Sequence, residues 1–170
     1  DYGEDVHLMV AGEGGVRRDR LLKRVLVDGT TIYYMGEPGR ERVVRVKKSE
    51  TVRHYEGERE QEVLVRKDEG FDEEDEATKT TYFAGGRGEE RKIREVYTDG
   101  SRTVYFDGPR GKERMTSEAW ALYTVYFAGE RGEERKIRVE WPGGKAVYYQ
   151  GERGHEREVP AQGRRARPLS

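Results

Sequence analysis

The chain has 170 residues, of which 39% are charged and 33% hydrophobic, with a net charge of −1 and a mean hydropathy of −1.06. This length predicts one domain, the near-neutral charge argues against a general nucleic-acid binder, and no apolar run approaches the length of a membrane span. Cysteine is absent, which excludes disulfides and thiolate metal sites.

Short aromatic or apolar pairs recur along the chain, and each pair is followed two residues later by a glycine. The segments 82–94 and 126–138 are copies of one phrase that differ only at Gly86 against Glu130. The period of about 22 residues marks a repeat architecture. The glycines that anchor the copies are Gly12, Gly36, Gly57, Gly85, Gly108, Gly129 and Gly151.

Each copy has the pattern of a β-hairpin. Thr103–Phe106 and Thr124–Phe127 are rich in β-branched and aromatic residues, which suit a pleated strand. The Gly-Glu-Arg-Gly phrase supplies two residues that tolerate positive φ in the loop, and Glu134–Val139 predicts the return strand. Residues 1–160 are therefore expected to form a single all-β domain, an elongated open antiparallel meander of about seven hairpins.

A loop centred two residues after the anchor glycine predicts which side chains share a face. The predicted pairs are Phe127 with Arg135 and Val125 with Ile137 on one face, and Tyr126 with Lys136 and Thr124 with Arg138 on the other.

The unit resembles a MORN repeat, whose core phrase is Tyr-x-Gly-Glu. Tyr55–Glu58 matches this phrase best, and Tyr34–Glu37 and Tyr149–Glu152 follow it. The second half departs from that family, because Glu-Arg-x-Val/Ile-Arg replaces its Gly-x-Gly, as at Glu41–Arg45. Bacterial YD-type repeats are the second-best match. The MORN resemblance implies a scaffold, dimerisation module or adaptor, in some cases near membranes, and it brings no catalytic motif.

No constellation in the sequence predicts catalysis, a cofactor or a metal site. His7, His54 and His155 are not spaced as converging ligands, and the glycine-rich stretches 12–15 and 85–88 lack the helix and Lys-Ser/Thr of a phosphate loop. The recurring Glu-Arg pairs predict a structural ladder, because an active site is normally one place rather than several.

Three segments lie outside the regular pattern. The acidic stretch 68–77 is expected to be an insertion loop, either solvated or a dock for a basic partner with Phe71 as its anchor. Trp120 and Trp141 are candidates for local packing or for partner contact. Residues 161–170 are expected to be a basic mobile tail.

The expected function is a non-catalytic structural or scaffolding subunit that binds a protein partner or self-associates through its sheet. A peripheral membrane or phospholipid adaptor and a carbohydrate-binding sheet remain as alternatives, whereas a nucleic-acid partner is not expected. The compartment is open; an intracellular location, after removal of a targeting segment if there is one, is favoured. The candidate interaction residues are Tyr33, Tyr82, Tyr105, Tyr126, Tyr148, Trp120, Trp141 and Phe71.

Overall fold

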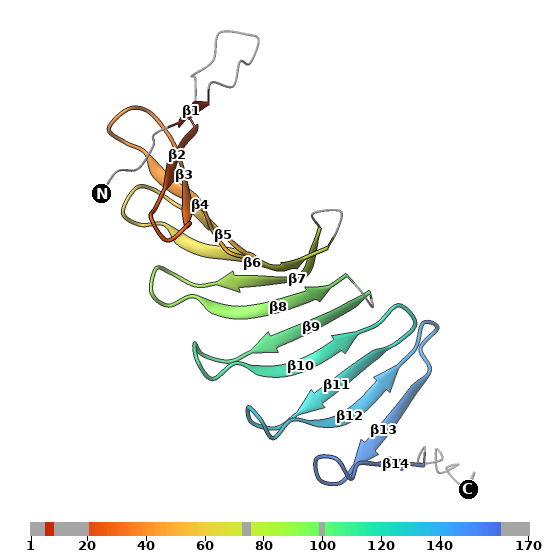
Figure 1. Cartoon of the computed structure of the whole chain (residues 1–170). Coiled ribbons are helices and arrows are strands. Elements are labelled where there is room, and N and C mark those ends of the chain that lie inside the picture. The colour runs from red at the N-terminus through yellow and green to blue at the C-terminus, as the bar shows by residue number, and fades with distance from the viewer. Residues whose placement is uncertain (1–5, 9–20, 73–75, 99–100, 161–170) are drawn as a thin grey trace, which may run out of the picture.

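The computed structural model describes residues 6–8, 21–72, 76–98 and 101–160. These residues form one 14-stranded antiparallel sheet whose strands are paired in chain order (Figure 1). The described residues contain no helix, so the predicted all-β open meander is confirmed. The strands are β1 (Val6–Leu8), β2 (Leu21–Val25), β3 (Thr31–Met35), β4 (Arg42–Lys48), β5 (Thr51–Glu56), β6 (Val63–Phe71), β7 (Ala77–Ala84), β8 (Arg91–Tyr97), β9 (Arg102–Asp107), β10 (Arg114–Ala119), β11 (Thr124–Ala128), β12 (Arg135–Glu140), β13 (Ala146–Gln150) and β14 (Arg157–Val159).

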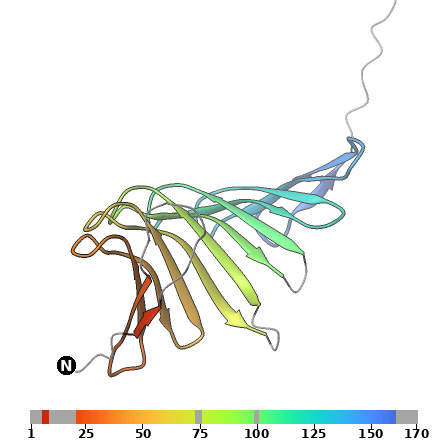
Figure 2. The same cartoon turned by 90° about the horizontal axis from the view of Figure 1, so that it is seen from above.

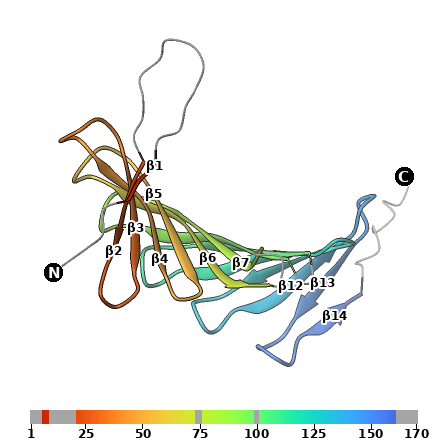
Figure 3. The ribbon, with the colours of Figure 1, turned by 45° about the horizontal axis from the view of Figure 1, so that its top comes forward.

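The sheet is a single twisted layer that does not close into a barrel. Figure 2 shows its curvature from above, and Figure 3 shows the strand direction turning progressively from β2 to β13. Right-handed strand twist accumulates in this way across an open sheet. No described element covers either face, so both faces are available for contact.

The loops that contain the anchor glycines line one edge of the sheet, on the left in Figure 1. In the β11–β12 loop, Glu133 N donates to Glu130 O at 2.9 Å and closes a β-turn. Gly129 and Gly132 have φ angles of 117° and 82°, so the prediction of two positive-φ positions in the loop is confirmed. Gly132 is the third residue of the turn, the position at which a type II turn requires positive φ.

The β5–β6 loop places a non-glycine residue at this position, since Glu60 has φ 65°. A left-handed conformation costs an L-residue about 1–2 kcal/mol, and the Arg59–Glu60 ion pair at 4.0 Å is exposed and offsets little of it. We therefore expect Glu60→Gly to raise the free energy of unfolding by about 1 kcal/mol. Urea titration checks this, with Gly111→Ala, at the same loop position, as a control that loses a similar amount. An unchanged or lower stability of Glu60→Gly contradicts the prediction.

The predicted cross-strand pairing is wrong, because each return strand from β4 to β12 carries a β-bulge. In β11–β12, Tyr126 pairs with Arg138 and Phe127 with Lys136, which leaves Ile137 as the extra residue. Ala128 pairs with Arg135, so the loop is centred between Arg131 and Gly132 rather than on Arg131, where the sequence interpretation placed it. The other two predicted pairs are replaced by Val125 with Val139 and Thr124 with Glu140.

Because of the bulge, the side chains on each face differ from those that the sequence predicted. Lys136 shares a face with Phe127, whereas Arg135, Ile137 and Arg138 share the other face with Tyr126. We name the two surfaces by the aromatic row that each carries, since side chains alternate along a strand. The Tyr face carries Tyr33, His54, Tyr82, Tyr105, Tyr126 and Tyr148, and the Phe face carries Tyr34, Tyr55, Phe83, Phe106, Phe127 and Tyr149.

The hydrophobic core is thin. Among the described residues, the buried hydrophobic side chains are Val52, Val104, Val125 and Val139, and no side chain is fully buried. Stability therefore depends on many small cross-strand contacts, each worth roughly 0.2–1 kcal/mol.

The acidic stretch 68–77 is not a loop over its whole length. Asp68, Glu69 and Phe71 belong to β6, and Ala77 begins β7 opposite Phe71. The acidic residues can enter the sheet because basic partners neutralise them there, as Lys67 does for Glu69 at 3.0 Å. The predicted basic tail, 161–170, lies outside the described residues.

Candidate interaction face

An unbroken row of paired residues crosses the Tyr face from strand to strand. The register joins Tyr33 to Arg45, His54 to Arg66, Tyr82 to Arg94 and Tyr126 to Arg138 within hairpins. It also joins each of these arginines to the tyrosine or histidine of the next hairpin. The tyrosine row is therefore interleaved with arginines, and it brings together the candidate residues Tyr33, Tyr82, Tyr105, Tyr126 and Tyr148.

Arginines stack on three of these rings. Their Cζ atoms lie 4.0 Å from the ring centroid of Tyr33, 4.2 Å from that of Tyr82 and 4.1 Å from that of Tyr126. Such contacts stabilise by about 0.5–1 kcal/mol at exposed sites, so the row is part of the fold as well as part of the surface. Arg94 Nε is buried there without a hydrogen-bond partner.

Two tyrosines lack the stacked arginine of their own hairpin. Ser117 stands opposite Tyr105, and Val159 stands opposite Tyr148. These tyrosines are 41% and 55% exposed, which leaves their rings open to a ligand.

A second row of cations runs beside the tyrosine row, closer to the loops. We name it the arginine row: Arg91, Arg114, Arg135 and Arg157, which pair with Ala84, Asp107, Ala128 and Gln150. Arg91 lies 4.0 Å from the exposed Asp107, and Arg114 Nη1 donates to Gly129 O at 3.3 Å. Within the described part of the chain, no carboxylate pairs with Arg135 or Arg157.

The Tyr face is basic although the whole chain is nearly neutral. By register, its carboxylates are Glu56, Asp68, Asp107 and Glu140, whereas its cations are Lys23, Arg42, Arg45, Lys47, Arg66, Arg91, Arg94, Arg114, Arg135, Arg138 and Arg157. Net charge does not report this segregation, which creates a local positive potential.

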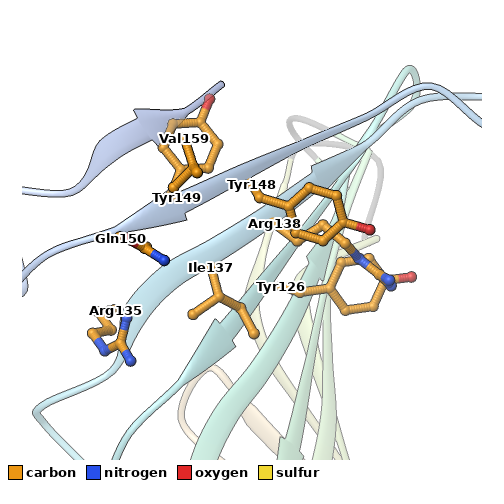
Figure 4. Close-up of a pocket in the computed structure, with 8 residues that line it drawn as sticks. All are labelled: Tyr126, Arg135, Ile137, Arg138, Tyr148, Tyr149, Gln150 and Val159. Atoms are coloured by element: carbon orange, nitrogen blue, oxygen red, sulfur yellow. The ribbon is translucent and has the colours of Figure 1, made fainter. Parts of the chain in front are cut away.

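A shallow depression of about 670 Å³ lies on the Tyr face between β11 and β14. Figure 4 shows the Arg138 side chain between the rings of Tyr126 and Tyr148, with Ile137 beside them and Arg135 nearer the loops. The lining combines aromatic, aliphatic and guanidinium groups, which suits an extended ligand with both apolar and acidic side chains.

Asp68 forms a buried polar network on the same face. Its carboxylate accepts hydrogen bonds from Arg66 Nε at 2.8 Å and Thr80 Oγ1 at 2.9 Å, and it lies 2.9 Å from His54 Nε2. Burial alone would raise the pKa of Asp68, yet these three partners hold it below the ordinary value. With Asp68 only 5% exposed, this network is structural.

Contacts of lysines with aromatic rings and with carboxylates stabilise the Phe face. Lys92 Nζ lies 3.9 Å from the Phe106 ring centroid, which joins one hairpin to the next. Lys92 also pairs with buried Glu95 at 3.0 Å. Tyr97 OH donates to Glu95 at 2.8 Å, and burial together with this carboxylate raises the pKa of Tyr97 to about 12. Most lysines of this face thus pair with a carboxylate, whereas Arg24 and Arg53 have no carboxylate partner among the described residues.

Trp120 and Trp141 meet at the other edge of the sheet through Tyr123. The ring centroids of Trp120 and Tyr123 are 6.2 Å apart, and those of Tyr123 and Trp141 are 6.4 Å apart. Both tryptophans therefore pack locally, and neither joins the tyrosine row. Leu122, in the same turn as Tyr123, is 72% exposed.

A glutamate of every anchor-glycine loop from β5–β6 to β13–β14, together with an arginine of most of them, clips the loop to the preceding hairpin. Strand pairing between hairpins ends at the tyrosine row, for example at Arg138–Tyr148. Beyond it, Glu156 Oε1 accepts from Lys136 N at 3.1 Å, and Arg153 donates to Gly132 O. The same glutamate contact recurs at Glu62, Glu90, Glu113 and Glu134, and the same arginine contact at Arg59, Arg110 and Arg131.

The clip lowers the pKa of these glutamates. For Glu90 the largest cause is its own backbone N–H, and the N–H of Leu64 and the charge of Arg110 act in the same direction. For Glu134, backbone N–H groups and Arg153 outweigh the opposing effect of burial. The glutamates of the repeated phrase thus form the expected ladder.

The structure adds features that the sequence interpretation missed. The arginine row was overlooked because the bulge moves Arg135 to the Tyr face, and nothing in the periodicity marks a bulge. The Arg-Gly clip was visible in principle as an arginine recurring two residues after the anchor glycine, at Arg59, Arg87, Arg110, Arg131 and Arg153.

Comparisons with known proteins give no relative: no family model, no curated protein and no solved structure matches this chain. In the described part of the chain, His, Asp and Glu side chains do not gather into a group of three or more that could hold a metal ion. That part also contains no helix long and apolar enough to cross a membrane.

Proposed function

We propose that this protein is a non-catalytic interaction subunit that binds an acidic surface of a partner protein through its Tyr face. The observation that carries the proposal is the set of arginines on that face without a carboxylate partner among the described residues: Arg42, Arg45, Arg94, Arg135 and Arg157. Electrostatic complementarity of this kind fixes partner choice and accelerates association. The resemblance to MORN repeats supports the same class of function.

The positive charge of the Tyr face restricts the kind of partner that this face can bind. Two Tyr faces packed against each other would bring unpaired arginines together, so self-association through this face is disfavoured. Stacked arginines occupy one side of the Tyr33, Tyr82 and Tyr126 rings, which leaves little of the row as a platform for sugars. An acidic protein surface is not repelled by the arginines, and its binding does not require uncovered tyrosine rings.

A site-specific photo-crosslinker tests the proposal on the full chain in its native source. We expect p-benzoylphenylalanine at Tyr105, which is 41% exposed on the Tyr face, to crosslink one acidic protein. The matched position is Phe106, the next residue on the opposite face, where that crosslink should be absent. Raising the salt to about 0.5 M, where the Debye length is roughly 4 Å, should weaken capture at Tyr105.

Equal crosslinking from both positions, or crosslinks only to copies of the same chain, contradicts a partner on the Tyr face. A peripheral membrane adaptor is the second candidate, because the same unpaired arginines suit anionic headgroups. Salt-sensitive sedimentation with phosphatidylserine vesicles, together with no protein crosslink at Tyr105, would replace the first candidate by the second.

A further inference from the structure

In the C-terminal half of the Tyr face, arginines recur at an interval that matches the repeat of an extended peptide. The arginine row takes one residue from every second strand, namely Arg91 on β8, Arg114 on β10, Arg135 on β12 and Arg157 on β14. Paired strands are about 4.8 Å apart, so each hairpin advances by about 9.6 Å at the tyrosine row, where pairing between hairpins ends. The glutamate contacts of the clip join the hairpins beyond that row, so successive arginines follow one another at roughly this interval. The row therefore offers a cation at a regular interval along a line that crosses the strands.

A polyproline II peptide repeats at nearly the same interval. It has three residues per turn and rises about 3.1 Å per residue, so residues i, i+3 and i+6 lie on one side about 9.3 Å apart. A nucleic-acid strand instead places a charge every ~3.4 Å of helix axis, which is too dense for one phosphate per arginine. The spacing thus favours a peptide over a nucleic acid.

Apolar contacts for such a peptide lie beside the arginines. Tyr105 and Tyr148 have no arginine of their own hairpin over their rings, and Val159, which pairs with Tyr148 in the register, also lines the depression of Figure 4. Polyproline II ligands dock on aromatic-lined grooves through their preformed backbone. The proline rings of the peptide, which lie between its acidic side chains, can pack against these tyrosines. The carboxylates of the peptide can then pair with the arginines.

We infer that the C-terminal half of the Tyr face binds an extended, proline-containing peptide that crosses the strands and carries an acidic side chain at every third residue. This inference rests on the proposed function and specifies the partner segment that the basic face receives. Arg135 and Arg157 have no carboxylate partner among the described residues, so both guanidinium groups are free to meet the peptide.

Fluorescence anisotropy with the full chain and labelled synthetic peptides tests the inference. The probe is a peptide of four Glu-Pro-Ala triplets, and its control has the same composition with the glutamates clustered at one end. We expect the triplet peptide to bind about five-fold more tightly or better, because only it can reach several arginines at once. Arg135→Gln with Arg157→Gln should lower its affinity by about five-fold or more.

The matched control removes the same charge from the other face. Arg24→Gln with Arg53→Gln changes two arginines that the register places on the Phe face, and it should leave peptide binding unchanged. Equal affinity for the triplet and clustered peptides, an equal loss in both double variants, or tighter binding of a single-stranded oligonucleotide would overturn the inference. If no peptide binds while Tyr105 still crosslinks an acidic protein, the inference fails and the proposed function stands; if both measurements fail, neither stands.

Discussion

Replacing Gly85 by alanine is expected to lower the free energy of unfolding by at least about 3 kcal/mol. Gly85 has φ 116°, a conformation that L-residues rarely adopt, and an added Cβ would lie 2.5 Å from Glu89 O and 3.1 Å from Glu89 C. The clashing atoms are backbone, so the loop cannot move them without opening the turn that Glu89 N closes on Gly86 O at 2.9 Å. Chemical denaturation followed by circular dichroism measures the loss.

The same loop supplies two matched controls. Gly88 also has positive φ, 77°, but a Cβ there meets nothing within 4 Å, so Gly88→Ala should cost only about 1–2 kcal/mol. Gly86 has neither a positive φ nor a close neighbour, so Gly86→Ala should be neutral or stabilising by up to about 1 kcal/mol. Equal losses at all three positions would show that loop flexibility, rather than the clash at Gly85, sets the stability.

Replacing Asp68 by asparagine is expected to cost about 2–3 kcal/mol of unfolding free energy at pH 7. Asp68 is 5% exposed and holds Arg66, His54 and Thr80 together. The amide cannot accept from all three partners, and it leaves the Arg66 charge without its counter-ion. Asp107→Asn is the matched control, because its side chain is 68% exposed and lies 4.0 Å from Arg91; it should change stability by less than about 0.5 kcal/mol.

The cost of Asp68→Asn should depend on pH in one direction. The pKa of Asp68 is lower in the folded chain than its ordinary value of 3.8. The charged carboxylate therefore contributes its full stability above about pH 4, and this contribution is lost as the pH falls through the folded pKa. We expect the stability difference between the parent and Asp68→Asn to be constant from pH 7 to pH 5 and to shrink below about pH 3.8. A difference that persists unchanged at pH 2 would mean that packing, not charge, is lost.

The repeat itself could be predicted from the sequence because local chemistry determines it. The anchor glycines recur where a Cβ would strike the loop backbone, as at Gly129 against Glu133 O at 2.6 Å. The aromatic pairs recur where β-strands favour them, and the glutamate of each loop recurs because it binds the preceding hairpin. These contacts lie within one repeat or between two neighbours, so their period appears directly in the sequence.

The composition of the two faces was decided only by the tertiary structure. A single bulge residue such as Ile137 shifts the register and turns Arg135 from the expected Phe face to the Tyr face. A bulge depends on how the loop and the next hairpin share hydrogen bonds, and no residue type in the strand demands it. The placement of Asp68 inside the sheet likewise depends on partners from neighbouring strands, Thr80 and His54. Sequence alone thus determined a repeated hairpin, whereas cross-strand hydrogen bonding determined which face carries the arginine row, on which the proposed function depends.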